Sequence, residues 1–283
     1  MAASTIITYL TGINYFQKVM GFKDLNTYPI INKTVLGLQK RRPKSSVKSP
    51  VNLSTLEKLI TASALCLSNL YDIKAFQCYL SVQFFGLFRV SELLGDPRLK
   101  INSLQLGNLL LEQNEAVLRL DSFKHSLGKG AEITLCKQVN SLICPIKLLN
   151  SYLSVRGTGT GPLFLTSSGR PLSKRQCASQ LRRCCAAAGF AANQFTSHSL
   201  RIGAATLAAQ MGKSTAEIMT LGRWSSTAYI QYIRSVDPLM APQVLSPRCA
   251  AAPSSAAPDA SSQVPQAARP APHTPAWTTH KRR

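Results

Sequence analysis

The residues best suited to chemistry lie between positions 198 and 232, where a histidine, two arginines, a tryptophan and a tyrosine follow one another. His198 and Arg201 stand three positions apart, Gly222-Arg223-Trp224 follows, and Tyr232 comes soon after. A tyrosine is a poor nucleophile unless cationic donors surround the group that it attacks, and few site types need these residue classes together. The combination indicates attack of a tyrosine on a phosphate, which in DNA would break a strand.

His198 and Arg201 are expected in the first turn of a helix. Thr196 and Ser197 can cap that helix, so both side chains would project from one face of it. The amino end of a helix attracts anions, and an arginine can donate two parallel hydrogen bonds to a phosphate. Because this four-residue pattern is common by chance, a purely structural role for the pair remains the alternative.

A further arginine, Arg89, interrupts the apolar segment 86–94. A buried arginine needs a partner, and Glu92 lies one helical turn away. Glu92 could hold the guanidinium while one of its faces stays free for a substrate oxygen. A structural Arg89–Glu92 pair without a substrate is the alternative.

The elements that must position these residues are mainly helical. Apolar residues at helical spacing predict two largely buried helices before Arg89, and residues 54–57 and 214–217 have the pattern of capping boxes. Short apolar segments separated by polar turns predict strands. The fold class is therefore α+β, mainly α with a small antiparallel β-sheet. We expect strands over residues 104–111, 116–120 and 133–135, helices over 146–153, 173–188 and 198–211, a short helix that ends at Gly222, and a last helix that carries Tyr232.

Changes in composition divide the chain. Residues 1–38 form a small helical piece, and residues 39–52 form a basic linker, because prolines, serines and cations occur there without an acid. Residues 53–240 form the main domain. Residues 247–283 are rich in Ala, Pro and Ser, which cannot bury enough apolar surface to fold, so this tail is expected to be disordered.

The charge of the chain points to a polyanionic partner. The 283 residues include 33 Lys and Arg against 12 Asp and Glu, a formal net charge of +21. Nucleic acid is the first candidate, and a generally basic surface is the alternative. Individual cations could contact phosphates or only solvate a hinge and a helix face. The candidate DNA-binding residues are Lys40, Arg41, Arg42 and Lys44 in the linker, and Lys174, Arg175, Arg182 and Arg183 on one helix.

Cysteine spacing and the length of apolar segments indicate the cellular compartment. The eight cysteines include no C-x-x-C pair, so a zinc site or a disulfide framework has little support, and buried reduced thiols are expected. The amino terminus lacks the pattern of a secretion signal, and no apolar run is long enough to cross a bilayer. We expect an intracellular protein, in the nucleus of a eukaryote or the nucleoid of a bacterium.

Taken in order, these motifs resemble the tyrosine recombinase and integrase (phage integrase) family. They are Gly86-x-x-Arg89-x-Ser91-Glu92-Leu93, a lysine on a β-turn, His198-x-x-Arg201, Gly222-Arg223-Trp224 and Tyr232. The nearest group is that of the eukaryotic DIRS-like retrotransposons, and the resemblance covers roughly residues 1–240. It implies a catalytic domain over residues 53–240, preceded by a SAM-like, core-binding helical domain that is shorter than in most members. It also implies double-stranded DNA as partner, dimers on a site and tetramers in synapsis, with no cofactor, metal or membrane.

The resemblance implies a role for each site residue. Arg89 and Arg201 would grip non-bridging oxygens of the phosphate, and His198 would add a third donor. Tyr232 would be the nucleophile, favoured by its spacing from Gly222 over Tyr229, one turn earlier. Where relatives carry His or Trp after the glycine, this chain has Arg223 and then Trp224, and either could support the phosphate. Lys124 would protonate the departing 5′ oxygen, with Lys129 on the same hairpin as its rival.

The function implied is that of a site-specific DNA recombinase or integrase. Such an enzyme forms a 3′-phosphotyrosyl bond that conserves the energy of the broken linkage, so it needs neither a metal nor ATP to rejoin strands. Two alternatives stay open. One is an inactive DNA-binding protein derived from such an enzyme, and the other is a topoisomerase of type IB that only relaxes supercoils.

Overall fold

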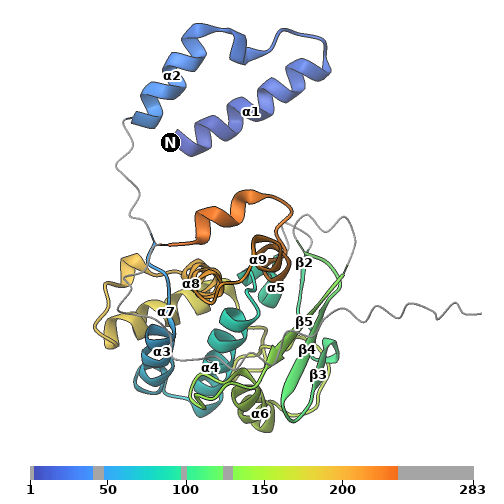
Figure 1. The fold of residues 1–283 in the computed structure, drawn as a ribbon, viewed down its shortest axis with the longest axis vertical. Coiled ribbons are helices and arrows are strands. Elements are labelled where there is room, and N and C mark those ends of the chain that lie inside the picture. The colour runs from blue at the N-terminus through green and yellow to red at the C-terminus, as the bar shows by residue number, and fades with distance from the viewer. Residues whose placement is uncertain (1–2, 41–47, 97–100, 124–129, 235–283) are drawn as a thin grey trace, which may run out of the picture. The chain divides into compact units, whose positions relative to one another are not determined.

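The computed structural model describes residues 3–40, 48–96, 101–123 and 130–234 (Figure 1). These form a helical pair, within residues 3–40, and a main domain, within residues 48–234. Several predictions fall outside the described residues and stay predictions. They concern Arg41, Arg42 and Lys44 of the linker, the hairpin lysines Lys124 and Lys129, and the tail 247–283.

The helical pair consists of α1 (Ala3–Val19), the short 3-10 helix η1 (Leu25–Thr27) and α2 (Pro29–Lys40). Gly21 follows α1 with a φ of 79°, a left-handed conformation that glycine adopts at little cost. The backbone N–H of Leu25 donates to Asn14 Oδ1 at 2.7 Å and so ties the turn to α1. The residues predicted as one helical piece thus form two helices with a turn between them.

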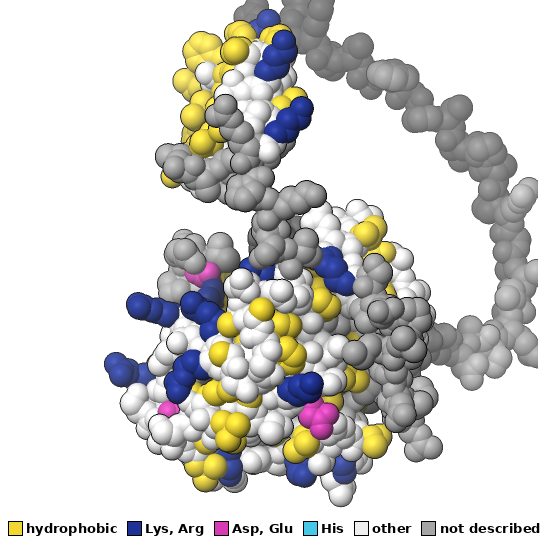
Figure 2. All heavy atoms as spheres, turned by 90° about the vertical axis from the view of Figure 1, so that its left-hand side faces the viewer, with side chains coloured by type: hydrophobic (Ala, Val, Ile, Leu, Met, Phe, Trp, Pro, Cys, Tyr) yellow, Lys and Arg dark blue, Asp and Glu magenta, His cyan; other side chains and the backbone are white. Residues whose placement is uncertain are grey.

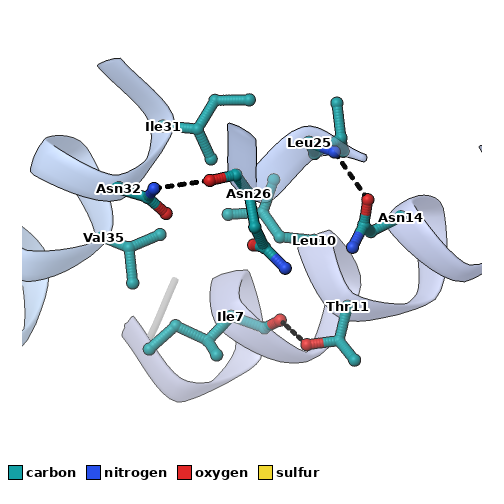
Figure 3. Close-up of a pocket in the computed structure, with 9 residues that line it drawn as sticks. All are labelled: Ile7, Leu10, Thr11, Asn14, Leu25, Asn26, Ile31, Asn32 and Val35. Atoms are coloured by element: carbon teal, nitrogen blue, oxygen red, sulfur yellow. Dashed lines mark hydrogen bonds between the residues drawn. The ribbon is translucent and has the colours of Figure 1, made fainter. Parts of the chain in front are cut away.

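Apolar side chains occupy two sides of α1. Ile7 and Leu10 line a small hollow that Ile31 and Val35 of α2 close from the other side (Figure 3). Other large apolar side chains of the pair are exposed and gather on one of its sides (Figure 2). Helix α1 is therefore apolar over more of its circumference than α2 covers. The exposed set on α1 and the residue after it comprises Tyr9, Ile13, Tyr15, Phe16, Val19 and Met20.

The main domain is built around α4 (Leu70–Phe85), whose residues are buried on nearly every side. Helices α3 (Leu53–Cys66), α6 (Pro145–Arg156) and α8 (Ser197–Gln210) pack against it. Apolar side chains are distributed around most of this helix, as is typical of a helix that its neighbours cover. The remaining helices are α5 (Val90–Leu94), α7 (Lys174–Ala187), α9 (Thr215–Gly222) and the 3-10 helices η3 (Leu106–Asn108), η4 (Ala192–Gln194) and η5 (Thr227–Tyr232).

Two small antiparallel sheets complete the main domain. Strand β1 (Gly95–Asp96) pairs with β2 (Ile101–Ser103), and β4 (Glu115–Leu120) lies between β3 (Leu109–Leu111) and β5 (Ala131–Cys136). Leu118 stands opposite Leu109 on one side and Ile133 on the other. A mainly helical fold with small antiparallel sheets is confirmed.

Two local predictions are wrong in detail. The strand expected over residues 104–111 is interrupted by η3, where the N–H of Asn108 donates to the carbonyl of Gln105 at 3.1 Å. The turn tendency of Gly107-Asn108 overcomes the β tendency of the surrounding leucines. The capping box expected at Ser54 is also displaced, because Asn52 Oδ1 accepts from the N–H of Thr55 at 2.8 Å and caps α3 instead.

The end of the predicted linker belongs to the main domain. Val51 is fully buried, and its N–H donates to the carbonyl of Ser199 at 3.0 Å. A Cβ on Gly203 would lie 1.7 Å from the carbonyl oxygen of Val51, so only glycine allows this approach. The contact fixes the amino-terminal half of α8, the helix that carries His198 and Arg201.

The expectation of reduced thiols is confirmed at six positions, and that of buried thiols at five of these. Five of the six free cysteines are buried, and Cys66 is partly exposed. Burial raises the pKa of Cys185 to about 11, which keeps this thiol protonated. Across the described ranges, no helix is both long and apolar enough to cross a membrane. The free cysteines are Cys66, Cys78, Cys144, Cys177, Cys184 and Cys185.

Candidate active site

Arg89 and Glu92 form the pair that their spacing predicted. Arg89 precedes α5, where its backbone N–H donates to Glu92 Oε2 and its Nη1 to Glu92 Oε1, each at 2.8 Å. The Glu92 side chain has no exposed surface, whereas that of Arg89 is 20% exposed. Glu92 therefore holds one side of the Arg89 guanidinium, and the Arg89 side chain keeps access to solvent.

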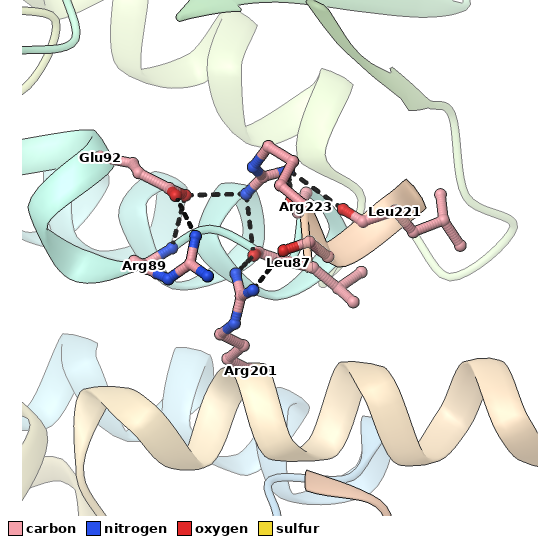
Figure 4. A network of polar contacts seen from close by, with 8 residues as sticks. Leu87, Arg89, Glu92, Arg201, Leu221 and Arg223 are labelled. Atoms are coloured by element: carbon pink, nitrogen blue, oxygen red, sulfur yellow. Dashed lines mark hydrogen bonds and ion pairs between the residues drawn. The ribbon is translucent and has the colours of Figure 1, made fainter. Parts of the chain in front are cut away.

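Arg201 lies at the centre of the site and is only 1% exposed. Its Nη1 donates to the carbonyl of Leu87 and its Nη2 to the carbonyl of Gly222 (Figure 4). The ring of Trp224 covers it, with 4.2 Å between the ring centroid and the guanidinium carbon. Burial and the charge of Arg89 lower the pKa of Arg201 to about 9, which still leaves it charged at neutral pH.

Arg223 points inward. It ends α9 with a φ of 55°, and its side chain is 6% exposed. Nη2 contacts Glu92 Oε2 at 2.8 Å, and Nη1 donates to the carbonyl of Gly86 at 3.2 Å. Burial by itself raises the pKa of Glu92, but the charge and hydrogen bond of Arg223, with the contacts from Arg89, hold that pKa below its ordinary value. Glu92 thus carries a negative charge between two arginines.

Trp224 follows the end of α9 and packs into the site. Its backbone N–H donates to the carbonyl of Met219 at 2.9 Å, which closes the end of α9. A Cβ on Gly222 would lie 1.6 Å from an atom of the indole, so the glycine makes room for the ring. The ring lies against Arg201 and has its centroid 5.0 Å from that of Tyr232.

The two tyrosines of η5 have different surroundings. Tyr229 is 6% exposed, and its hydroxyl donates to Thr215 Oγ1 at 2.9 Å. Tyr232 is half-buried, with its ring 4.8 Å from that of His198 and 5.7 Å from the guanidinium carbon of Arg201. In the described part of the chain, no side chain or backbone group bonds to the Tyr232 hydroxyl. Tyr232 is therefore the tyrosine beside the arginines, and the last helix, which was expected to carry it, is a 3-10 helix.

His198 stands at the rim of the site on the first turn of α8. Partial burial and the positive charges of Arg201, Arg89 and Arg234 lower the pKa of His198. A lowered pKa favours the neutral imidazole, whose two ring nitrogens can donate one hydrogen bond and accept another. Its place beside Arg201 follows from the three-residue spacing on the helix, as predicted.

Arg234 is a site residue that the sequence reasoning did not select. Its backbone N–H donates to Thr206 Oγ1 at 3.2 Å, and this bond holds Arg234 against α8. Its side chain contacts the carbonyls of Gln231 and Ile233. Its position two residues after Tyr232, in a segment without acidic residues, was the feature of the sequence that could have indicated it.

The site has more positive charge than it neutralises. Among the described residues, four arginines influence one another or His198 here, and Glu92 is the carboxylate that pairs with two of them. The Nε atoms of Arg201, Arg223 and Arg234 are buried without a hydrogen-bond partner. Buried donors are almost always bonded in folded proteins, so such a cluster suits an anion with several acceptor oxygens.

The cations predicted to bind DNA outside this cluster have varied surroundings. Lys174 contacts Asp96 at 2.6 Å, and Arg183 donates to the carbonyl of Cys66. Arg182 Nε donates to the carbonyl of Ala178 at 3.1 Å, within α7. Figure 2 shows the side of the main domain that carries α3 and α7, where Lys and Arg side chains stand apart with few acids beside them. Arg175 and Lys40 are exposed.

The fold is similar to that of solved DNA recombinases. The Tn1549 transposon integrase in complex with circular intermediate DNA has a TM-score of 0.56 and 12% identity over 84% of this chain and 76% of that one. The XerA recombinase has a TM-score of 0.52 and 18% identity, over 81% of this chain and 70% of its own. For XerH bound to its difH substrate the values are 0.52 and 19%, and 66% of this chain covers 50% of XerH. This chain thus spans about half the length of XerH, and identities this low show the fold alone.

Sequence comparison gives the family. No curated protein matches the chain. The model of the phage integrase family matches residues 56–237, which is more than half of the chain and contains Arg89, His198, Arg201 and Tyr232. The chain therefore belongs to the phage integrase family, the tyrosine recombinases.

Proposed function

We propose that this protein is a site-specific DNA recombinase or integrase that breaks and rejoins strands through a 3′-phosphotyrosyl bond. The observation that carries the proposal is the convergence of Arg89, Arg201 and His198 beside Tyr232, in a cluster whose positive charge exceeds its negative charge. A phosphodiester supplies both the negative charge and the acceptor oxygens that this cluster lacks.

The proposed reaction assigns one task to each group. The Tyr232 oxygen attacks phosphorus and forms a bond to it, while the bond from phosphorus to the 5′ oxygen breaks. Arg89 and Arg201 stabilise the charge that grows on the non-bridging oxygens. Neutral His198, beside Tyr232, can take up the phenol proton or donate to an oxygen. Lys124 is the proposed donor of a proton to the leaving 5′ oxygen. Attack by another 5′ hydroxyl reverses the step and rejoins DNA without a metal or ATP.

The hydrogen bonds of Arg201 support a preorganised site. Two backbone carbonyls hold its Nη atoms before any DNA is present, and Nε remains for a phosphate oxygen. Donors that are already in place avoid reorganisation when charge develops. Because Nε is buried, a phosphate can reach it only if a neighbouring side chain shifts.

The proposal extends to partners and setting. Double-stranded DNA is the proposed partner, in line with the DNA complexes of XerH and the Tn1549 integrase and with the net charge of +21. We further propose dimers on one site and tetramers in synapsis, and a mobile element of the DIRS-like group acting in the nucleus. Exposed Arg175 and Arg182 on α7 are candidate phosphate contacts.

Covalent trapping tests the function. A pool of nicked duplexes with randomised sequence around the nick would be incubated with the protein. Protein–DNA adducts that survive denaturation would then be quantified. We expect an adduct with the wild type and with Tyr229→Phe, and none with Tyr232→Phe. DNA binding without any adduct would favour the inactive binding protein. Relaxation of one supercoiled plasmid without exchange between duplexes would favour the topoisomerase.

A further inference from the structure

Arg223 uses its guanidinium on the protein itself. Nη1 donates to the carbonyls of Gly86 and Leu221 at 3.2 and 3.1 Å, and Nη2 to the carbonyl of Leu87 and to Glu92 at 3.0 and 2.8 Å. Each Nη therefore has an acceptor for both of its hydrogens. The guanidinium carbon lies 5.0 Å from the centre of the Phe88 ring, which covers it. Its contacts and burial make Arg223 unsuited to grip a phosphate through its Nη atoms.

Two of the partners of Arg223 are also partners of Arg89 and Arg201, the arginines proposed to bind the phosphate. Glu92 contacts Arg223 through Oε2 and Arg89 through Oε1. The carbonyl of Leu87 accepts from Arg223 and from Arg201 (Figure 4). One side chain thus reaches Arg89 through a carboxylate and Arg201 through a carbonyl.

Both residues at this junction have unusual backbones. Leu87 has a φ of 46° and Arg223 a φ of 55°, and in the described ranges they are the non-glycine residues with positive φ. Such conformations cost energy and persist where surrounding contacts fix them, often at functional sites. The left-handed turn at Leu87 presents its carbonyl to both arginines, and the one at Arg223 follows the end of α9 and precedes Trp224.

We propose that Arg223 is a positioning residue for strand breakage, which holds Glu92 and the Leu87 carbonyl and thereby sets the places of Arg89 and Arg201. The inference rests on the proposed function. Without Arg223, the buried carboxylate of Glu92 loses a charged partner, and Oε2 keeps only the backbone N–H of Arg89. A buried carboxylate in that state tends to take up a proton, which weakens its hold on the Arg89 guanidinium.

A double-mutant cycle tests the role. Arg223→Gln, Glu92→Gln and the double variant would be compared for DNA affinity and for the rate of adduct formation at saturating protein. We expect each single variant to form the adduct about a hundredfold more slowly, because a misplacement of about 1 Å at a reacting centre has that effect. DNA affinity should change less than about threefold, since the Nη donors of Arg223 are used within the protein, and coupling should leave the double variant within about threefold of the slower single one.

Arg223→Lys covers the case in which a Gln variant does not fold. Lysine keeps a positive charge beside Glu92 but cannot span the carboxylate and three carbonyls, so we expect a rate about tenfold below the wild type with unchanged DNA affinity. Arg119→Gln is the matched control, because Arg119 pairs with Glu132 on the exposed face of the sheet. Its rate should equal that of the wild type.

The outcomes separate the two claims. An Arg223→Lys or Arg223→Gln protein that forms the adduct at the wild-type rate overturns the positioning role alone. So does a double variant slowed by the product of the two single factors, which would mean that Arg223 acts independently of Glu92. A wild-type protein that forms no adduct overturns the proposed function, and the positioning role with it.

Discussion

Replacement of Gly222 by alanine should displace Trp224 and open the site from one side. The added Cβ would lie 1.6, 1.9 and 2.5 Å from three atoms of the indole. Contacts below 3 Å do not occur between real atoms of this kind, so the ring must leave its place. Trp224 then loses its packing over Arg201 and beside Tyr232.

The size of the effect follows from the groups involved. Loss of a buried tryptophan typically costs about 3–5 kcal/mol, and a cation–π contact about 1 kcal/mol of this. Alanine regains about 1 kcal/mol over glycine within a helix, although Gly222 is the last residue of α9. We therefore expect Gly222→Ala to lower the free energy of unfolding by about 3 kcal/mol. Trp224→Ala alone should cost about 4 kcal/mol.

Urea denaturation of the wild type, the two single variants and the double variant measures these free energies of unfolding. In the Trp224→Ala background there is no ring to clash with, so Gly222→Ala should cost nothing further, and the coupling should be about 3 kcal/mol. Gly107→Ala is the control, because a Cβ there meets nothing within 4 Å. Additivity of the two substitutions within about 0.5 kcal/mol would refute the contact between Gly222 and the indole.

Three further predictions concern the surroundings of the site. Tyr229→Phe should lose the bond to Thr215 and about 1 kcal/mol of stability, yet keep the adduct; loss of the adduct with an intact fold would make Tyr229 the nucleophile. The pKa of His198 is lowered in the folded protein, so His198 is protonated in the unfolded chain before it is protonated in the folded one. The free energy of unfolding should therefore fall as pH drops below about 6.5. His198→Gln should lessen this fall in urea titrations at pH 7.5 and 5.5, and an unchanged fall would refute its assignment to His198. Gly203→Ala should cost about 3 kcal/mol through the clash with Val51. Wild-type stability of that variant in thermal melts would show that residues 48–51 do not pack on α8.

Short-range spacing predicted much of the site. The Arg89–Glu92 pair and the placement of His198 and Arg201 on one helix need only a one-turn separation, which a sequence displays directly. The capping box at Ser214 and Glu217 likewise forms as its pattern predicted. Local chemistry decides such features, so the sequence is sufficient for them.

Other features depend on contacts between distant segments. Arg223 and Glu92 are far apart along the chain, and nothing local shows that Arg223 turns inward while Trp224 faces Tyr232. Asn52 and Ser54 are both good helix caps, and the packing of Val51 on α8 favours the former. Tertiary packing decides these features. For that reason the sequence left the orientation of Arg223 and Trp224 open and led to a wrong prediction for the helix cap.

The central claim is that Tyr232 forms the bond to DNA. Mass spectrometry of the trapped adduct tests it directly, because trypsin releases the peptide 224–234 with both tyrosines of η5. Fragment spectra distinguish the two positions. We predict a nucleotide on Tyr232 with a free 5′ hydroxyl on the released strand. A nucleotide on Tyr229, or on a residue outside this peptide, would contradict the claim.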